Sequence, residues 1–268
     1  MKSAIKKIIP FWLGRKLRGG YQKINGLLYS GDSYYCPYCK KSFRKFLPGG
    51  FDLPVLYEKQ IIGAGFRNND VCPRCYSLDR DRLVYLFLQE KTTIFSSPLK
   101  LFHVAPEGCL RAMLSELPNL LYVPGVKYLE GYYYARQTHL LDITAIPYED
   151  ESFDVIICNH VLEHIPNDNL AIRELYRVLK PGGWAILQVP ISKVLKTTYE
   201  DPSITDPESR EQVFGQFDHV RIYGQDYKNR LENGGFVVKT YNPTREKWKS
   251  NLTQYAINPE EDLYVAYK

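Results

Sequence analysis

The chain has 268 residues, of which 44% are hydrophobic, and a formal net charge of +5. This length exceeds an average domain, so we expect one large domain with a buried core plus a smaller appendage. No apolar run approaches the ~20 residues that span a bilayer. The apolar stretch Ile8 to Leu13 is too short for a secretory signal, so we expect neither a membrane span nor export, and a cytoplasmic location.

The positive charge is concentrated at the N-terminus. Residues 1–45 contain eleven Lys or Arg residues and a single acid, Asp32. We treat residues 1–33 as a basic arm. Its apolar residues, including Phe11 and Trp12, would allow peripheral contact with an anionic membrane surface, and its charge would also suit nucleic acid. A solvated extension, or a helix docked on the body, explains the same pattern.

Four of the six cysteines form two pairs, Cys36-Pro-Tyr-Cys39 and Cys72-Pro-Arg-Cys75. Two such turns supply the four thiolates that a structural Zn²⁺ ion binds tetrahedrally. Disulfides would require export, and a redox C-x-x-C pair does not explain two copies. We therefore predict a zinc ribbon over residues 34–76, rich in β-structure and too poor in core to fold without its metal.

The ribbon also carries a basic and aromatic segment. Lysines and arginines at positions 40, 41, 44 and 45 surround Phe43 and Phe46. This mixture is typical of RNA-binding surfaces, so nucleic acid is a candidate partner. Alternatively, the two phenylalanines form the core of the ribbon and the charges face water.

Ser77 to Lys91 predicts a helix with Ser77 as its N-cap. Residues 83–88 give it a broad apolar face, which is expected to pack against a sheet. This helix would join the ribbon to the larger domain, over residues 77–268. Arg80 and Arg82 lie outside the apolar stripe and are expected to be surface charges.

A strand-helix-strand unit occupies the middle of the chain. The apolar run Phe153 to Cys158 has the length of a buried parallel strand, and Asn159 and His160 follow where it ends. Apolar residues three and four apart predict a helix over Asp168 to Lys180, which Pro-Gly-Gly ends before a strand over Trp184 to Val189. A right-handed crossover is expected.

This unit resembles the class I S-adenosylmethionine-dependent methyltransferases, particularly the branch that mostly modifies small molecules. The matching motifs, in order, are Asp142-Ile143, Phe153-Asp154 with its apolar strand, His160-Val161-Leu162-Glu163-His164-Ile165 and Leu179-Lys180-Pro181-Gly182-Gly183. The resemblance covers about residues 99–268. It implies an α/β, Rossmann-like fold with a seven-stranded, mostly parallel sheet and helices on both faces. Its other strands would be Leu99–Val104, Val126–Glu130, Phe236–Tyr241 and an antiparallel Asp262–Tyr267, with a helix over Asp226–Asn233.

The resemblance also implies S-adenosylmethionine as the cofactor, bound at the carboxyl ends of the strands. In the turn after the first strand, His103 takes the family's acidic position, and Ala105, Glu107 and Cys109 replace its three glycines. Ala105 and Gly108 still permit a close turn. Glu107 is a candidate acceptor for the ammonium group of the cofactor.

Further cofactor-binding residues follow from the same resemblance. Glu130, at the end of the second strand, is the candidate for the ribose hydroxyls. Asp142 and Ile143 are the candidates for adenine, although Asp142 could instead cap the turn that follows it. Asn159 and His160 are expected on the methionine side, near the methyl group.

The acceptor is expected to bind in the insertion over residues 191–224. His219 is the candidate general base, because its ordinary pKa of about 6.5 suits proton removal at neutral pH, and Asp218 or Glu200 is expected to orient it. A capping or core role for His219 is the alternative. His164 is expected to be a packing histidine.

These features predict a methyltransferase with an N-terminal zinc ribbon that acts on a small polar acceptor. A zinc ribbon followed by a His-Val-Ala-Pro-Glu turn resembles bacterial proteins of surface-glycan assembly, which makes a sugar or sugar nucleotide the first candidate acceptor. One alternative is an RNA methyltransferase whose ribbon holds the substrate. Another is a non-catalytic, methyltransferase-like binding protein, suggested by the missing glycines.

Overall fold

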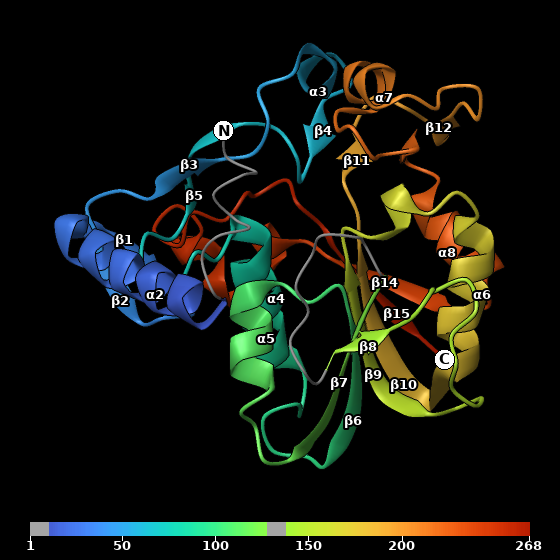
Figure 1. Ribbon diagram of the computed structural model, residues 1–268, viewed down its shortest axis with the longest axis horizontal. Coiled ribbons are helices and arrows are strands. Elements are labelled where there is room, and N and C mark those ends of the chain that lie inside the picture. Colours follow the sequence, from blue (N-terminus) through green and yellow to red (C-terminus); the bar gives the residue numbers. More distant parts are fainter. Residues whose placement is uncertain (1–10, 128–137) are drawn as a thin grey trace.

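The computed structural model describes residues 11–127 and 138–268, and its centre is a seven-stranded sheet in the order β14-β15-β10-β9-β6-β7-β8 (Figure 1). The strands are β6 (Leu99–Val104), β7 (Leu120–Val126), β8 (His139–Leu140), β9 (Phe153–Asn159), β10 (Leu179–Gln188), β14 (Val237–Tyr241) and β15 (Leu263–Tyr267). Only β15 is antiparallel to its neighbours, β10 and β14. The predicted seven-stranded, mostly parallel sheet is confirmed.

Helices cover both faces of this sheet (Figure 1). They are α4 (Asp79–Lys91) and α5 (Gly108–Leu114) on one face, and α6 (Asp168–Val178) and α8 (Tyr227–Asn233) on the other. Successive residues of a strand point to opposite faces. In β9, accordingly, Val155 packs in the core below α4 and α5, and Ile156 packs in the core below α6 and α8.

One predicted strand was wrong. The second strand was expected at Val126–Glu130, but β7 ends at Val126. Pro124 and Gly125 argued against a strand over residues 120–126, because proline cannot donate a ladder hydrogen bond and usually marks an edge strand or a break. Among the described residues, β8 pairs with β7 at Gly125 and Val126, so Pro124 has β6 alone as a ladder partner there and is tolerated.

The N-terminal region combines short strands and helices. It contains α2 (Phe11–Leu28), β1 (Ser30–Cys36), β2 (Lys41–Phe43), β3 (Leu47–Gly49), α3 (Pro54–Glu58), β4 (Ile61–Ile62) and β5 (Arg67–Val71). Strand β1 pairs with β2, and β3 pairs with β5. The apolar run Leu53 to Leu56, expected within a β-rich ribbon, lies mostly in helix α3, with Pro54 in its first turn. None of the described helices has both the length and the apolarity to cross a bilayer.

Part of the N-terminal region joins the insertion above the sheet. Strand β4 pairs antiparallel with β11 (Ile191–Ser192), and Leu56 packs in one cluster with Phe214 and Ile222. The rest of the insertion contains β12 (Tyr199–Glu200), α7 (Pro207–Phe214) and β13 (Arg221–Ile222). In Figure 1, α3 and α7 lie side by side at the top, beyond the upper ends of the central strands. Residues predicted to belong to the ribbon therefore form part of the cover over the carboxyl ends of the strands.

The linking helix is confirmed, but two residues at its start differ from expectation. Its N-cap is Leu78 rather than Ser77, and Ser77 is fully buried. Arg82 was expected at the surface, which is wrong because its side chain is 0% exposed. It donates hydrogen bonds to the backbone carbonyls of Asp70, Ser77, Tyr255 and Ala256. The C-terminal segment covers this part of α4, a contact that helical periodicity cannot reveal.

Candidate functional site

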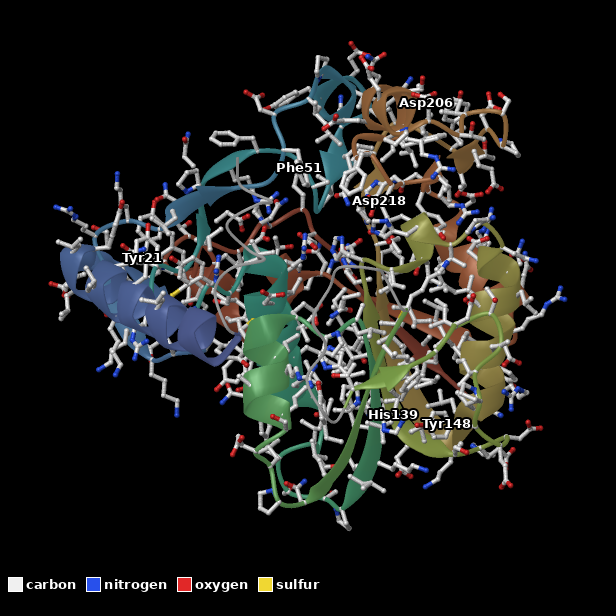
Figure 2. All side chains as sticks on the ribbon, viewed as in Figure 1. Tyr21, Phe51, His139, Tyr148, Asp206 and Asp218 are labelled. Atoms are coloured by element: carbon white, nitrogen blue, oxygen red, sulfur yellow. The ribbon has the colours of Figure 1, made fainter. Side chains whose placement is uncertain are left out.

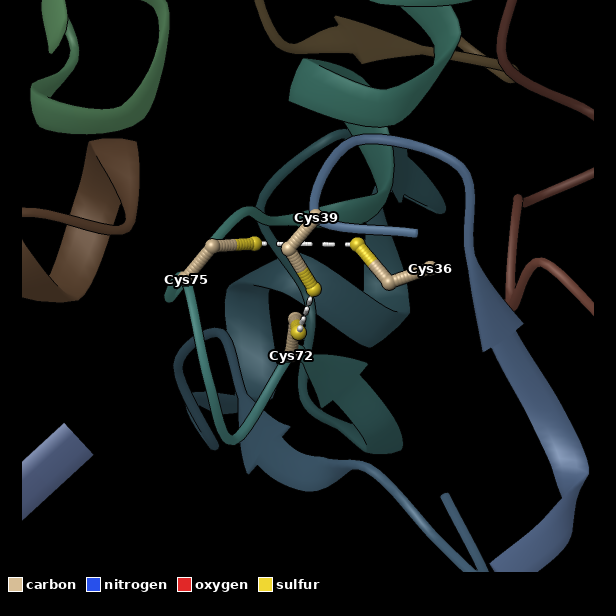
Figure 3. A group of neighbouring side chains, drawn as sticks. All are labelled: Cys36, Cys39, Cys72 and Cys75. Carbon is tan, nitrogen blue, oxygen red and sulfur yellow. Dashed lines mark hydrogen bonds between the residues drawn. The ribbon is translucent and has the colours of Figure 1, made fainter. Parts of the chain in front are cut away.

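The four paired cysteines converge at one point (Figure 3). The sulfurs of Cys36 and Cys75 are 3.6 Å apart, and those of Cys39 and Cys72 are 3.7 Å apart. A tetrahedral zinc ion with Zn–S bonds of about 2.3 Å places its sulfurs about 3.8 Å apart. All four cysteines are free, with sulfurs far beyond the ~2.05 Å of a disulfide. The cluster is compatible with a zinc site.

The two cysteine turns have the same backbone geometry. The N–H of Lys40 donates to the carbonyl of Cys36, and the N–H of Tyr76 donates to the carbonyl of Cys72, at 2.8 and 2.9 Å. Lys40 and Tyr76 both have a left-handed backbone, with φ of 52° and 59°. This repetition brings two thiols together in each turn, as a zinc knuckle requires.

The aromatic residues beside the cysteines are core residues. Phe43 and Phe46 are 1% and 0% exposed, and they pack in one small cluster with Cys36 and Cys72. The structure therefore leaves neither ring available for stacking on a base, which is the interaction that an RNA-binding surface of this kind needs.

The turn after β6 is built around a buried histidine. His103 accepts a hydrogen bond from the hydroxyl of Tyr122 at 3.0 Å, and its Nε2–H donates to Glu107 at 2.9 Å. The other oxygen of Glu107 accepts from Asn159 at 2.9 Å. Burial raises the pKa of Glu107, but the contacts with His103 and Asn159 together outweigh burial, and the pKa falls below its ordinary value. Glu107 is therefore a carboxylate that bridges the ends of β6 and β9.

The side chains that stand at the family's glycine positions do not fill the space in front of this turn. Ala105 is exposed and has a φ of 45°, the left-handed conformation that favours glycine, at a cost of about 1 kcal/mol. A methyl group added at Gly108 would meet nothing within 4 Å. The thiol of Cys109 donates to Asp81, into the protein. The turn thus keeps an open side despite its side chains.

Two polar atoms at the end of β9 are buried without a partner. They are Oδ1 of Asn159 and Nε2 of His160, neither of which has a hydrogen bond in the described protein. His160 has a φ of 52°, and its N–H donates to the carbonyl of Gln188 at 2.7 Å. Burial lowers the pKa of His160 to about 4, so the ring is neutral at neutral pH.

Asp142 lies directly beyond β8, and its side chain is exposed. Its Oδ1 accepts from the N–H and the hydroxyl of Thr144, at 2.8 and 2.7 Å, which lowers its pKa. This is the turn cap that the sequence left open as an alternative. Ile143 is buried. Glu130, the candidate for the ribose, lies outside the described residues.

His219 lies in a pocket beneath the insertion. It is 5% exposed, its Nδ1–H donates to the carbonyl of Phe214 at 3.3 Å, and its ring packs edge-on against His164 at 4.7 Å. Glu163, Leu56 and Phe214 line the same pocket. Burial lowers the pKa of His219. His164, expected to be a packing residue, therefore lies beside the candidate base.

The two acids expected to orient His219 have other partners. Asp218 lies 3.3 Å from Nδ1 of His164. Burial raises the pKa of Asp218, but its contacts with His164 and Gln216 together outweigh burial and lower the pKa to about 2. Glu200 is held by the guanidinium groups of Arg221 and Arg230, at 2.8 and 3.1 Å. The expectation that Asp218 or Glu200 orients His219 is therefore corrected. Asp218 contacts His164, and two arginines hold Glu200 more strongly than a neutral imidazole could.

Glu261 is a residue that sequence reasoning missed. It is 2% exposed, and one of its oxygens has no hydrogen-bond partner in the described protein. It lies near Gly63 and lines a second pocket with Gln188. Burial, and then the nearby Asp79, raise its pKa to about 8. Nothing in the local sequence Pro-Glu-Glu-Asp distinguishes it from its exposed neighbour Glu260.

Replacing Glu261 with Gln is expected to stabilise the protein at high pH. The pKa in the folded state is above the ordinary 4.5, so the wild-type carboxylate becomes progressively destabilising as the pH rises from about 4.5 to 8. The variant should gain on the order of 3 kcal/mol at pH 9 and almost nothing at pH 4. Urea unfolding at both pH values, with Glu260→Gln as the matched control, measures this. Equal gains at the two pH values would contradict the assignment.

Comparison with known proteins gives partial matches. Residues 126–187 match a family model described as a methyltransferase domain. The chain is 30% identical to the arsenite methyltransferase of Aquipseudomonas alcaligenes over 38% of this chain and 28% of that protein. It is 26% identical to the ubiquinone/menaquinone biosynthesis C-methyltransferase of Pasteurella multocida over 50% of this chain and 42% of that protein. A solved S-adenosylmethionine-dependent methyltransferase from Archaeoglobus fulgidus aligns with a TM-score of 0.43 at 15% identity, over 72% of this chain and 95% of that one. The matches span less than half of either curated relative.

Proposed function

We propose that this chain, whose α/β domain is a class I S-adenosylmethionine-dependent methyltransferase domain, transfers the methyl group of that cofactor to a small polar acceptor. The observation that carries the proposal is the open turn after β6 beside the unpartnered polar atoms at the end of β9. Ligands of open α/β sheets bind at this edge.

Several residues are suited to hold the cofactor. The Glu107 carboxylate, fixed by His103 and Asn159, would accept from the ammonium group. The free oxygen of Asn159 and the free nitrogen of His160 would bind the remaining polar groups of the methionine part. Asp142 and Ile143 would hold the adenine. When bound, the cofactor supplies an activated methyl group, and the protein contributes alignment and exclusion of water.

The cover above the sheet supports a small acceptor. Residues of α3 and β4 pack on the insertion and close the space above His219 with apolar side chains, including Leu56 and Phe214. The burial of Phe43 and Phe46 removes the aromatic half of an RNA-binding surface. A hydroxyl of a sugar or sugar nucleotide is therefore the proposed acceptor, with His219 beside it. We also propose that Cys36, Cys39, Cys72 and Cys75 hold a structural zinc ion.

Replacing Asp142 with Ala is expected to weaken the binding of S-adenosylhomocysteine about tenfold, because one charge-assisted hydrogen bond to adenine is lost. The matched control is Asp201→Ala. Asp201 caps Ser203 with the same pair of hydrogen bonds, but in the insertion. Calorimetric titration measures both variants, and unchanged affinity of the Asp142 variant would refute the adenine assignment.

Methyl transfer itself is tested with radiolabelled cofactor and two acceptor pools, sugar nucleotides and total RNA. The expected result is label in the sugar nucleotides. Label in RNA, with salt-sensitive binding that is lost when residues 1–76 are removed, would favour the RNA alternative. A chain that takes up no S-adenosylhomocysteine would be a binding protein only.

A further inference from the structure

Glu163, His164 and His219 form a cluster that the proposed function does not explain. One ligand atom from each residue lies within 4.8 Å of the others. Glu163 and His164 belong to the short turn Leu162–His164 that follows β9, whereas His219 comes from the insertion. Two distant segments of the chain therefore bring two imidazoles and one carboxylate to the same point.

Glu163 lacks the partners that a buried carboxylate requires. It is 2% exposed, and neither of its oxygens has a hydrogen-bond partner in the described protein. Nδ1 of His160, whose ring is neutral at neutral pH, lies 3.4 Å from Oε1 of Glu163. The contrast with Asp168 is direct, because that equally buried carboxylate accepts from Tyr223 and from Arg230. An ionised carboxylate left alone in the interior costs several kcal/mol, so the two free oxygens of Glu163 indicate a missing ligand.

The two histidines are oriented as metal ligands usually are. Nδ1 of His219 donates to the carbonyl of Phe214, and Nδ1 of His164 is held by the carboxylate of Asp218. Each of these contacts fixes the proton on Nδ1 and leaves the lone pair on Nε2. Metal-binding histidines carry the same outer contacts, to a backbone carbonyl or a carboxylate.

We propose that Glu163, His164 and His219 bind a divalent transition-metal ion. Two imidazoles and one carboxylate are a ligand set that suits Zn²⁺, Mn²⁺ and Fe²⁺ and leaves coordination positions open. Glu163 and His219 line the pocket beneath the insertion, and His160 of the proposed cofactor site lies beside Glu163. The open positions would receive an oxygen of the acceptor next to the methyl donor. This last step rests on the proposed function, and it makes His219 a ligand instead of a base.

The full chain is first given one equivalent of Zn²⁺, which the four thiolates bind in preference to the nitrogen and oxygen ligands. The second site is then tested by titration with Mn²⁺, followed by electron paramagnetic resonance. Mn²⁺ prefers nitrogen and oxygen ligands, so the cysteine cluster should not compete. The wild type is expected to bind one equivalent. Glu163→Gln and His219→Ala should weaken binding by about a hundredfold or more, and Asp218→Asn by about tenfold. His139→Ala, an exposed histidine distant from Asp218 in Figure 2, should change nothing.

Absence of Mn²⁺ binding by the folded wild type, or unchanged binding by Glu163→Gln and His219→Ala, would overturn the proposal. Circular dichroism checks that each variant is folded, and the isosteric Glu163→Gln is the most conservative of them. The titration uses neither methyl donor nor acceptor. Metal binding without any methyl transfer would therefore support this site and count only against the proposed function.

Helix α2 carries a second, independent feature: its apolar face points away from the protein. Leu17, Tyr21, Ile24 and Leu28 are 55%, 60%, 57% and 62% exposed. Their spacing of three and four residues places them on one side of the helix. Figure 2 labels Tyr21 on this helix.

The side of α2 that carries Gln22, Asn25 and Gly26, adjacent to this stripe, is the one that docks. Asn25 is buried and donates to the hydroxyl of Tyr76, and Gly26 lies so close to Arg74 that an added methyl group would come within 2.8 Å of it. A surface helix in water normally buries its apolar side and exposes its polar side, and α2 does the reverse. Its apolar side requires another cover.

We infer that the exposed stripe of α2 lies on an anionic lipid surface. The helix contains four basic residues, Arg15, Lys16, Arg18 and Lys23, and no acid. This charge complements acidic headgroups, and an apolar stripe with an aromatic residue is the pattern of interfacial helices. A second copy of this chain, with the same positive charge on its helix, would be repelled.

The test is co-sedimentation of the full chain with phosphatidylglycerol-containing vesicles and with pure phosphatidylcholine vesicles. Binding to the anionic vesicles only is expected, and Leu17→Asp with Ile24→Asp should reduce it at least about tenfold. The matched control is Leu121→Asp, which alters an equally exposed leucine of β7. No vesicle binding by the wild type, or a dimer in light scattering that the double variant dissociates, would overturn the inference.

Discussion

Replacing Arg82 with Met is expected to lower the free energy of unfolding by about 3–5 kcal/mol. Arg82 lies at the junction of three parts of the chain: the ribbon, the start of α4 and the C-terminal segment. Its guanidinium donates to the carbonyl of Asp70 in the ribbon and to that of Ser77 before α4. It also donates to the carbonyls of Tyr255 and Ala256 in the C-terminal segment. Methionine keeps much of the side-chain volume but leaves four carbonyls without their donor, at about 1–3 kcal/mol for each one that water cannot reach.

Urea denaturation measures this change, with Arg173→Met as the control. Arg173 is an exposed residue of α6, so its replacement should alter stability by no more than about 0.5 kcal/mol. A difference of less than about 1 kcal/mol between the two variants would show that the buried network of Arg82 is not a major stabilising contact.

Replacing Cys72 with Ser is expected to release the metal of the cysteine cluster and to unfold residues around it. The local core contains little besides Phe43, Phe46 and the cysteines themselves. Metal binding to such small units supplies on the order of 10 kcal/mol, which their apolar contacts cannot replace. The α/β domain has its own two cores and should stay folded.

Cobalt substitution gives the appropriate measurement, since thiolate-to-metal charge-transfer absorption arises only from the cysteine cluster. The wild type should show this band and Cys72→Ser should lose most of it, while limited proteolysis should cut the variant within residues 30–76. Cys109→Ser is the control, because Cys109 pairs with Asp81 outside the cluster. A Cys72 variant that retains full metal would count against a four-thiolate site.

The family resemblance and the local patterns together predicted most of the architecture. A continuous apolar run gave the buried strand β9, helical periodicity gave α6, and Pro-Gly-Gly marked the start of β10. The motif order implied the arrangement of the sheet. The two cysteine turns were predictable because each is a four-residue motif that closes on itself. Strand β7 was misplaced because Pro124 is tolerated where β8 does not pair with it, and the local sequence does not show at which residue of β7 the pairing with β8 begins.

The sequence by itself determined the elements whose cause lies within a few residues: the buried strand, the helix and the cysteine turns. Only the tertiary structure decided the state of the charged residues. Arg82 is buried against a segment whose carbonyls lie more than 170 residues further along the chain. Glu163 and His219 lie together although more than 50 residues separate them in the sequence. The energy of a charge depends on burial and on its partners in space, and neither quantity is written in the residues beside it.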